Sequence, residues 1–495
     1  MSSLRTVGLG PIVGHVTSTT ARIWVRRGDP ADEVADIARH RRTVGVIAIV
    51  AIDGKKLRNR SAHYFRLQRE FDRTGVFTLG ADTGIGETAT SLELTPGTQY
   101  SVRVGTLTID DPDPDSDSIS NDLLGKRLPA ASVWVNEEFE ALNDYESLAS
   151  FTTARAPGAE QVDMAFLLGS CRYPGLLWKA KHADKIFGPM LEEALGRQGR
   201  SAVDMTLMVG DQIYADKLNR RVKGGLANTF EEFQERYHTA FGSRRMRKLL
   251  RKVPTYMILD DHEIEDNWAQ DRIKKAESRN VFNLAINAYM SYQWLHGPRS
   301  YGRRLFYNFG LGGYPFFVLD TRTQRYMDDI AGQLDDNHML GRPTLSEEEP
   351  SQLDHLLHWL GEQDPRVPKF IVTSSVFVPN PMDAREGRKG RPEDKVKWKE
   401  GSDSWPAFPS TRKVIPRHIV DKKLQNVIFL SGDIHCANVA TLHFKGNAVA
   451  ESLKAFSVTS SALYWPFPFA DGEPSAYVHD STRPKQKDTS RSDEG

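Results

Sequence analysis

The stretch MTLMVGDQIYAD, residues 205–216, decides the fold of the larger part of this chain. The short, mostly apolar run MTLMV ends abruptly in GDQIYAD, and a helical pattern follows further along. Three other segments repeat this arrangement: MAFLLGS (164–170), YMILDDHE (256–263) and NVIFLSGDIH (426–435). Short apolar strands that alternate with helical patterns are typical of α/β proteins. We therefore expect an α/β domain over residues 162–470.

Each of these four strands ends in residues that can bind a metal ion. They are Cys171, Asp211, Tyr214, Asp216, Asp260, Asp261, His262, Asp433 and His435. Any one of them has an ordinary structural explanation, such as an aspartate that caps a helix. In an α/β sheet, however, ligands gather at the carboxyl ends of the strands, so four such endings predict one shared site.

The types of side chain suggest two metal ions. A thiolate, a phenolate and an imidazole suit a transition-metal ion, and the phenolate favours ferric iron; these residues are Cys171, Tyr214 and His435. Carboxylates would supply hard oxygen ligands to a second ion, with the first of them bridging both; these are Asp211, Asp261 and Asp433. A pair of metal ions can activate water and hold both the attacking and the leaving oxygen of an in-line displacement. This set of ligands therefore favours hydrolysis of phosphate esters.

His262 is the expected catalytic residue. It follows the presumed ligand Asp261, so its imidazole would face the substrate and donate a proton to the leaving oxygen or stabilise phosphoryl charge. Asp260 would orient it. Arg172 could bind a nonbridging phosphate oxygen, although a surface ion pair explains this residue equally well. Asn267 could supply a further oxygen ligand or cap a turn.

Residues 1–155 predict a small all-β sandwich, because alternating strands are separated by turn signals such as the Pro-Gly pair in LTPGTQYSVRV (94–104). The acidic, serine-rich segment 109–122 reads as a mobile insertion without a site. Residues 380–405 predict a long surface loop that could cover the site, and residues 471–495 predict a disordered tail.

Composition excludes some classes of partner. The 65 basic and 65 acidic residues balance, so nothing points to nucleic acid or an anionic membrane as an obligatory partner. Two cysteines give no disulfide framework. The strand period places Cys436 on the face opposite His435, where it would pack, and a bond to Cys171 would remove a ligand. Without a visible export signal or membrane span, the chain as written is expected to be cytoplasmic, or secreted if a signal was trimmed.

The motifs GDQIYAD, DDHE (260–263) and GDIH (432–435) together resemble the alkaline phosphatase D (PhoD-like) form of the calcineurin-like metallophosphoesterases. SCRYPG (170–175) is similar to the opening of that family's catalytic domain, and the amino-terminal strands resemble its fibronectin III-like sandwich. The resemblance implies a four-layer α/β/β/α domain, a ferric ion with calcium as its partner, and phosphomonoesterase or phosphodiesterase activity by attack of a metal-bridging hydroxide.

Residue by residue, the resemblance makes Asp211 the bridging aspartate, Tyr214 the phenolate ligand and Asp261 the counterpart of a metal-binding asparagine. His262 matches the catalytic histidine and His435 the last metal histidine.

Two departures from the wider superfamily bear on the metals. Ser-Cys-Arg replaces the usual Asp-x-His motif, and Asp433 stands where a histidine is usual. Fewer nitrogen ligands argue for calcium or magnesium at the second site.

Three functions stay open at this stage. The first is a phosphomonoesterase or phosphodiesterase acting on small phosphate esters. The second is phospholipase-like cleavage of lipid phosphodiesters. The third is a non-catalytic binding protein with a degenerate metal site.

Overall fold

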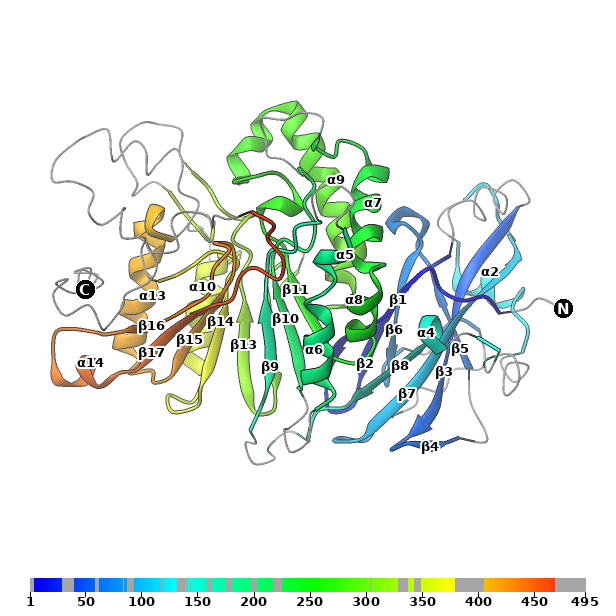
Figure 1. Cartoon of the computed structure of the whole chain (residues 1–495), viewed down its shortest axis with the longest axis horizontal. Coiled ribbons are helices and arrows are strands. Elements are labelled where there is room, and N and C mark those ends of the chain that lie inside the picture. The colour runs from blue at the N-terminus through cyan, green and yellow to red at the C-terminus, as the bar shows by residue number, and fades with distance from the viewer. Residues whose placement is uncertain are drawn as a thin grey trace.

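The computed structural model describes most of the chain (Figure 1). The described residues are 4–28, 40–57, 62–82, 84–86, 93–116, 119–130, 139, 141–142, 144–156, 158, 163–174, 180–196, 203–216, 225–302, 304–327, 337–341, 349–378 and 405–467. The expected loop 380–405 lies outside them except for Trp405, which is buried, and the expected tail 471–495 lies outside them entirely.

The amino-terminal part, here called the sandwich half (residues 4–156), consists mainly of two antiparallel sheets. One sheet contains β1 (Leu9–Val16), β2 (Ala21–Arg26) and β6 (Thr74–Leu79). The other contains β3 (Arg41–Ile52), β4 (Lys55–Lys56), β5 (Ala62–Arg66), β7 (Gln99–Asp110) and β8 (Leu148–Thr152). Alternate residues such as Ile23, Val102 and Val104 point into one buried core shared by the two sheets.

The acidic segment 109–122 has more contacts than its composition suggested. Asp111 accepts hydrogen bonds from Arg42 (3.1 Å) and Arg69 (2.8 Å), and Ile119 is buried beside α2 (Asn121–Gly125). The described part of this segment is therefore held against β3 by an ion-pair network and by one apolar anchor.

The rest of the chain, here called the α/β half (residues 163–467), has two further sheets, and the expected α/β fold is confirmed. The first sheet is parallel and contains β9 (Phe166–Gly169), β10 (Met205–Val209) and β11 (Thr255–Ile258). The second is mixed, in the order β12 (Tyr307–Leu311), β13 (Tyr314–Val318), β14 (Lys369–Val372), β15 (Val427–Ser431), β17 (Ala455–Thr459) and β16 (Asn438–Leu442).

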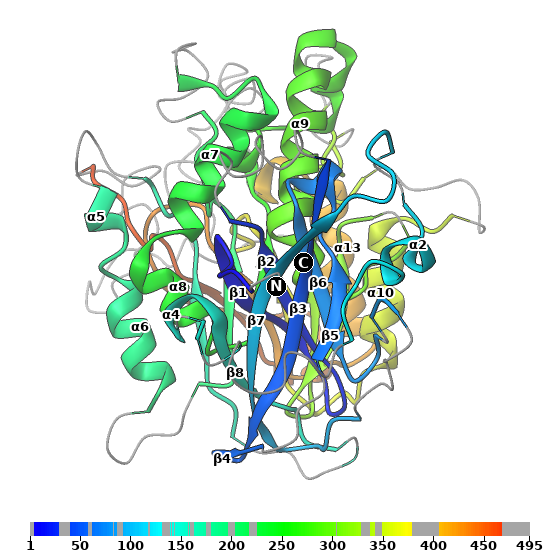
Figure 2. The same ribbon diagram turned by 90° about the vertical axis from the view of Figure 1, so that its right-hand side faces the viewer.

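Three buried clusters arrange this half in layers. A core rich in aromatic residues lies between the two sheets, where Phe309 and Tyr256 stack at 4.0 Å. The outer face of the three-stranded sheet packs on α6 (Phe187–Ala194), α7 (Phe230–Phe241), α8 (Arg244–Leu250) and α9 (Ala276–Tyr292). The outer face of the six-stranded sheet packs on α10 (Gln352–Glu362) and α13 (Pro409–Asp421). Figure 2 shows the same elements from the side of the sandwich.

Short helices complete the described structure: α4 (Asp144–Ser147), α5 (Ala180–Ala183) and α14 (Ala448–Ser452). The side chains of Thr229 and Ser351 cap the first turns of α7 and α10. Among the described helices, none has both the length and the apolar composition that a membrane crossing requires.

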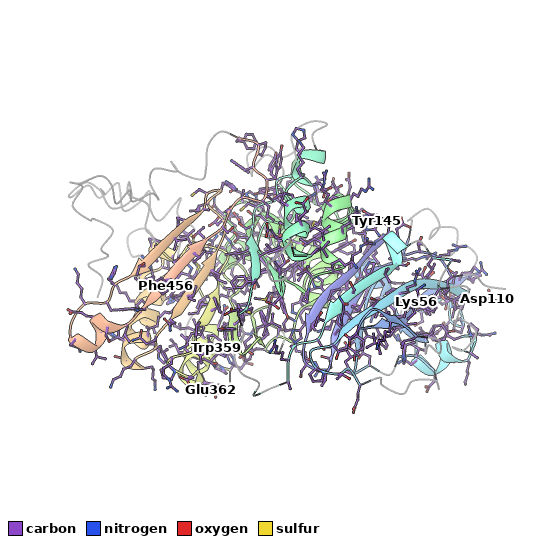
Figure 3. The ribbon with its side chains drawn as sticks, turned by 60° about the horizontal axis from the view of Figure 1, so that its bottom comes forward. Lys56, Asp110, Tyr145, Trp359, Glu362 and Phe456 are labelled. Atoms are coloured by element: carbon purple, nitrogen blue, oxygen red, sulfur yellow. The ribbon has the colours of Figure 1, made fainter. Side chains whose placement is uncertain are left out.

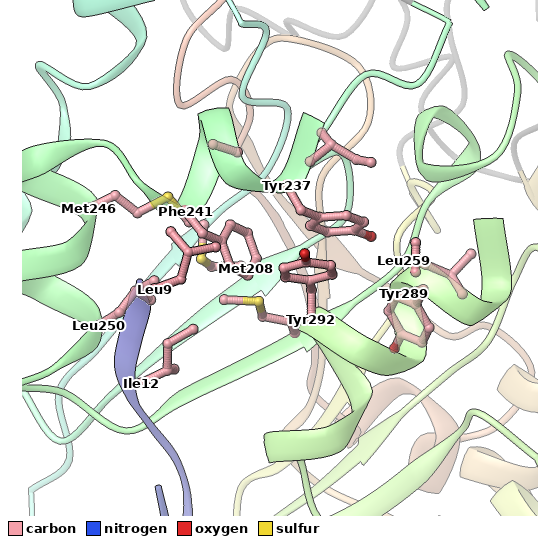
Figure 4. Packing of buried hydrophobic residues seen from close by; sticks show 14 of the residues in the cluster. Leu9, Ile12, Met208, Tyr237, Phe241, Met246, Leu250, Leu259, Tyr289 and Tyr292 are labelled. Carbon is pink, nitrogen blue, oxygen red and sulfur yellow. The ribbon is translucent and has the colours of Figure 1, made fainter. Parts of the chain in front are cut away.

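The two halves share a hydrophobic core. Leu9 and Ile12 of β1 belong to the same buried cluster as Met208 of β10 and Leu250 of α8 (Figure 4). Trp24 of β2 is fully buried in this cluster and donates a hydrogen bond to the carbonyl of Ser291 in α9. Because burying apolar surface is the main favourable term in folding, the two halves stabilise each other.

A polar network also crosses this join. Asp72 of the sandwich half is 3% exposed and accepts two hydrogen bonds from Arg26, at 2.8 and 2.9 Å. It also accepts a hydrogen bond from Tyr292 and lies 3.2 Å from Nε2 of His238. Burial alone would raise the pKa of Asp72, but hydrogen bonds from His238 and Arg26 lower it below its usual value.

We expect Asp72→Asn to lower the free energy of unfolding by about 3–5 kcal/mol, because it leaves the buried Arg26 guanidinium without its countercharge. Asparagine keeps the size of the side chain and tolerates the left-handed backbone at this position. Urea denaturation followed by fluorescence measures the change.

Asp110→Asn is the control, since Asp110 pairs with Arg41 at 3.7 Å while 85% of its side chain is exposed. Figure 3 shows Asp110 at the far end of the sandwich half, away from the α/β half. Equal stabilities of the two variants would contradict a structural role for the network at the join.

Candidate metal centre

The loops after β9, β10, β11 and β15 meet at one edge of the two sheets. Three groups of side chains there could each hold a metal ion, because the ligand atoms within each group lie within 4.8 Å of one another. The groups are Cys171 with Asp211 and His435, Asp211 with Asp261 and His262, and Asp260 with Asp261 and Asp433. The structure therefore brings together the metal-capable residues that four separate strands were expected to deliver.

Backbone geometry explains how side chains from these strand ends converge. Cys171, Asp211, Asp433 and His435 all have positive φ angles, between 55° and 73°. Residues other than glycine rarely adopt this left-handed conformation, and such strain tends to cluster at functional sites. At this site the left-handed conformation turns the backbone sharply after each buried strand.

Four side chains surround a common point at the first group. Cys171 Sγ and Tyr214 Oη each lie 3.4 Å from Asp211 Oδ2, and Tyr214 Oη lies 3.3 Å from His435 Nε2. Among the described residues, Asp211 Oδ1 and His435 Nδ1 have no hydrogen-bond partner although both atoms are buried. Buried polar atoms are normally paired, so these orphaned atoms fit a site that holds a metal ion.

The shifted pKa values in this group are also consistent with a bound metal ion. Burial, and then the negative charge of neighbouring acids, raises the pKa of Cys171, and the same two causes raise that of Tyr214 well above its usual value. Burial also raises the pKa of Asp211. Three acidic groups that resist ionisation together would be stabilised in their charged forms by a cation at their centre.

The group of three carboxylates, Asp260, Asp261 and Asp433, already has a cation beside it. Arg322 is fully buried and donates through Nε to Asp260, while its Nη2 lies 3.4 Å from Asp261 and 3.8 Å from Asp433. Burial alone would raise the pKa of Asp261, but Arg322 and His262 hold it below the usual value. Carboxylate oxygens are present for a calcium ion, yet any such ion would share them with this guanidinium.

Arg322 was not among the site residues predicted from the sequence. The available signal was the strand PFFVLDTR (315–322), which ends in polar residues as the other site strands do. The position of Arg322 depends on β13 lying beside β14 in the six-stranded sheet, and that pairing is not visible in a local pattern.

His262 is oriented by a different carboxylate from the one expected. Its Nδ1 lies 2.7 Å from Oδ1 of the buried Asp216, and its ring lies 4.3 Å from the ring of Tyr214. Burial alone would lower the pKa of His262, but the charges of Asp216, Asp261 and Asp211 raise it well above the usual value. The prediction that Asp260 orients this imidazole is corrected, because Asp260 is paired with Arg322.

Arg172 also has contacts other than those expected. Its backbone N–H donates to the carbonyl of Asp211 at 2.8 Å, but its Nη2 donates to Ser243 and its guanidinium lies over Phe187. Burial lowers its pKa to about 10, so it stays cationic at neutral pH. No described contact joins its side chain to the metal-capable groups, and direct binding of the reacting phosphate therefore lacks support.

Glu263 holds the loops of the site in register. Its carboxylate accepts hydrogen bonds from the backbone N–H groups of Asp211 (2.9 Å), Gln212 (2.7 Å) and Asp260 (2.7 Å). Gly210, at φ 105°, is required beside them because a Cβ atom there would lie 2.4 Å from Asp260 Cβ. The loop after β10 is thereby fixed to the loop after β11.

One further aromatic residue, Trp465, and one amide residue, Asn267, lie at the edge of the site. The Trp465 ring stacks on the ring of His435 with 3.6 Å between centroids, and the backbone N–H of Asn267 donates to Asp261 at 2.5 Å. No motif in the sequence pointed to Trp465. The side chain of Asn267 donates to Asp266, so the described contact of Asn267 with Asp261 is made by its backbone.

Parallel strands whose ends gather thiol, phenol, imidazole and carboxylate groups form a candidate metal centre. The family model for PhoD-like phosphatases matches residues 186–483, and the chain belongs to that family. Alkaline phosphatase D of Bacillus subtilis (strain 168) is 25% identical in an alignment of 343 residues that covers 62% of this chain and 51% of that protein. The chain thus spans about half the length of this relative.

Solved structures show the same fold. A structure of PhoD matches with a TM-score of 0.62 and 18% identity, covering 94% of this chain and 78% of that one. Purple acid phosphatase PPD1 from yellow lupin (Lupinus luteus) seeds matches with a TM-score of 0.52 and 12% identity, covering 91% and 63%.

We expect Cys171→Ser to weaken metal binding by at least about tenfold, because it removes the thiolate while preserving the size of the side chain. The measurement is metal content by mass spectrometry after dialysis against a graded series of chelator concentrations.

Cys436→Ser is the matched control, because Cys436 packs beside Val376 and Ile434. The packing agrees with the prediction, although this segment is a bend after β15 and not a strand. It should keep the metal content of the wild type. Equal metal retention by both serine variants would remove Cys171 from the ligand set.

Proposed function

We propose that this chain is a metal-dependent phosphoric ester hydrolase, an alkaline phosphatase or phosphodiesterase of the PhoD type. One observation carries the proposal: the His262–Asp216 pair faces the same buried cluster that contains Cys171, Asp211 and Tyr214. The family membership supports it. In this proposal the clusters of the α/β half correspond to the α/β/β/α layers of metallophosphoesterases and the amino-terminal strands to their small β-sandwich.

The proposed metals are a ferric ion and a divalent ion, calcium by preference. Cys171, Asp211, Tyr214 and His435 would hold the iron, since phenolate and thiolate ligands suit that ion. Asp261 and Asp433, beside Asp211, offer oxygen ligands for calcium. When bound, such a pair supplies an activated water and neutralises charge on the phosphate.

His262 has the position of a general acid. Its Nδ1 is held by Asp216, which leaves Nε2 as the nitrogen that can give a proton to the leaving oxygen of the ester. A carboxylate partner stabilises the imidazolium form from which that proton comes. The fixed ring, held against Tyr214, avoids the entropic cost of finding this orientation in each turnover.

The proposed substrates are small-molecule or lipid phosphate esters. Turnover of p-nitrophenyl phosphate, of bis-p-nitrophenyl phosphate and of a short-chain phosphatidylcholine separates monoesterase, diesterase and phospholipase activities. Metal-loaded protein that turns over none of the three would support a non-catalytic binding protein and overturn the proposal.

We expect His262→Ala to lower kcat by about a hundredfold or more while metal content changes little, because the residue acts on the leaving group. Asp216→Asn should lower kcat less, since the imidazole remains but loses the partner that orients it. Rates are measured with p-nitrophenyl phosphate and metals by mass spectrometry on the same samples.

His358→Ala is the control, because His358 lies exposed on α10 and pairs only with Glu362 in the described structure. It should leave kcat unchanged. Near wild-type turnover by fully metallated His262→Ala protein would be inconsistent with the general-acid role.

Tyr214→Phe tests the iron. A phenolate bound to ferric iron gives a visible charge-transfer band, so the purified protein should be coloured and the variant should show a weakened or shifted band and lower iron content. Tyr173→Phe is the control, because its ring lies 5.0 Å from that of Tyr214 in the same aromatic group. Colourless, active wild-type protein that contains only zinc or manganese would refute the iron assignment.

A further inference from the structure

A second hollow lies behind one wall of the metal centre. The wall is the segment 170–174, whose side chains alternate between two sides. Cys171 belongs to the metal-capable group and Tyr173 contacts Tyr214, whereas Arg172 and Pro174 line the hollow. The hollow has a volume of about 510 Å³, which is within the usual range for small-molecule sites.

The described lining of this hollow is strongly cationic. It consists of Arg172, Pro174, Asp184, Thr239, Ser243, Arg244, Arg245 and Lys248. Four of these residues are basic and one is acidic. Both oxygens of that one carboxylate already accept hydrogen bonds, from the backbone N–H groups of Arg245 (2.9 Å) and Met246 (3.0 Å). These hydrogen bonds hold the carboxylate of Asp184 in place, and the four basic residues of the lining outnumber it.

The basic residues of α8 lie on two faces of the helix, and each face has different contacts. Arg247 donates to the carbonyl of Gly10 in the sandwich half, and its guanidinium lies over the ring of Tyr145. Figure 3 shows Tyr145 near the join of the two halves. Arg244 and Lys248, one helical turn apart, line the hollow instead and form no ion pair within the described part of the chain.

Arg172 adds a second, independent sign of a ligand. Its side chain is 97% buried, since only 3% is exposed, and it lines the hollow. Nη2 donates to Ser243 at 3.3 Å, but no described group accepts from Nε. A buried guanidinium is costly unless charges or acceptors satisfy it. The carboxylate of Asp184 offsets part of the charge of Arg172, and the hollow beside this guanidinium leaves room for a further anion.

We propose that this hollow is a second phosphate-binding site, separate from the metal centre, in which Arg172, Arg244 and Lys248 bind a phosphate group. Guanidinium and ammonium donors that converge on a cavity recognise phosphate through charge-assisted hydrogen bonds. The phosphate can come from two sources. It is either a further phosphate of a multiply phosphorylated substrate or free inorganic phosphate, and the chemistry of recognition is the same for both.

The test counts phosphate sites by equilibrium dialysis of metal-loaded protein with radiolabelled inorganic phosphate at low salt. Arg244→Gln/Lys248→Gln should bind one phosphate fewer per chain than the wild type, or bind it about tenfold or more weakly, because two charged donors are removed. If the metal centre does not bind phosphate, the wild type binds one and the variant none. The loss of one site is therefore expected whether or not the proposed hydrolase function is correct.

Lys413→Gln/Arg417→Gln is the matched control, because these two exposed residues are also one turn apart, on α13, away from the hollow. The control should bind as the wild type does. Diffraction from crystals soaked in tungstate, a heavy analogue of phosphate, should place an ion beside Arg244. Unchanged stoichiometry and affinity in the Arg244→Gln/Lys248→Gln protein, or tungstate confined to the metal centre, would overturn the proposal.

Kinetics distinguish the two sources. If the site holds a second phosphate of the substrate, the variant should raise KM for a bisphosphate ester several-fold and leave KM for p-nitrophenyl phosphate unchanged. If it holds free phosphate, both KM values should stay the same while the concentration dependence of inhibition by inorganic phosphate changes. Either result supports the site, and wild-type behaviour in both assays together with unchanged binding rejects it.

Discussion

The packing of four buried carboxylates against one another is the constraint on which the rest of the structure depends. Asp211, Asp260, Asp261 and Asp433 come from three different strand ends and are all at least nine-tenths buried. Burying even one unpaired carboxylate is costly, so this edge of the sheets needs cations in order to be stable in its ionised form. Arg322 provides one of them from a fourth strand.

The same edge is tied to the join between the two halves through a chain of hydrogen bonds and packed rings. Tyr292, which donates to Asp72 of the sandwich half, stacks on Tyr237 at 4.6 Å. Gln293 donates to Tyr237 (3.0 Å) and to Glu263 (3.1 Å), the residue that holds the loops after β10 and β11 together. The sandwich half thus contributes to the rigidity of the centre without supplying any of its candidate ligands. Loss of the contacts at the join should therefore also disturb the loops that carry the site.

Local patterns predicted the strands and the residues at their ends, because a short apolar run and the polar turn after it occupy adjacent positions in the sequence. They therefore located Cys171, Asp211 and His435, and the carboxyl ends of neighbouring strands meet by geometry. They did not predict pairing between distant residues. Asp260 was assigned to His262 because the two are close in sequence, whereas Asp216, 46 positions away, is the actual partner. Which strand carries Arg322 to Asp260 depends on sheet order, which no local pattern contains.

These contacts divide the centre into two electrostatic environments. Around Asp211, a thiol, a phenol and an orphaned carboxylate oxygen meet, and no described arginine or lysine forms an ion pair with that carboxylate. Around Asp261 and Asp433 the guanidinium of Arg322 already offsets much of the negative charge. A cation beside Asp211 shares that carboxylate with the imidazole of His262 but with no described guanidinium, whereas a cation at Asp261 also competes with the fixed guanidinium of Arg322. In the proposed two-metal centre, the thiol-containing site is therefore expected to bind its ion more tightly than the carboxylate site, which shares its oxygens with Arg322.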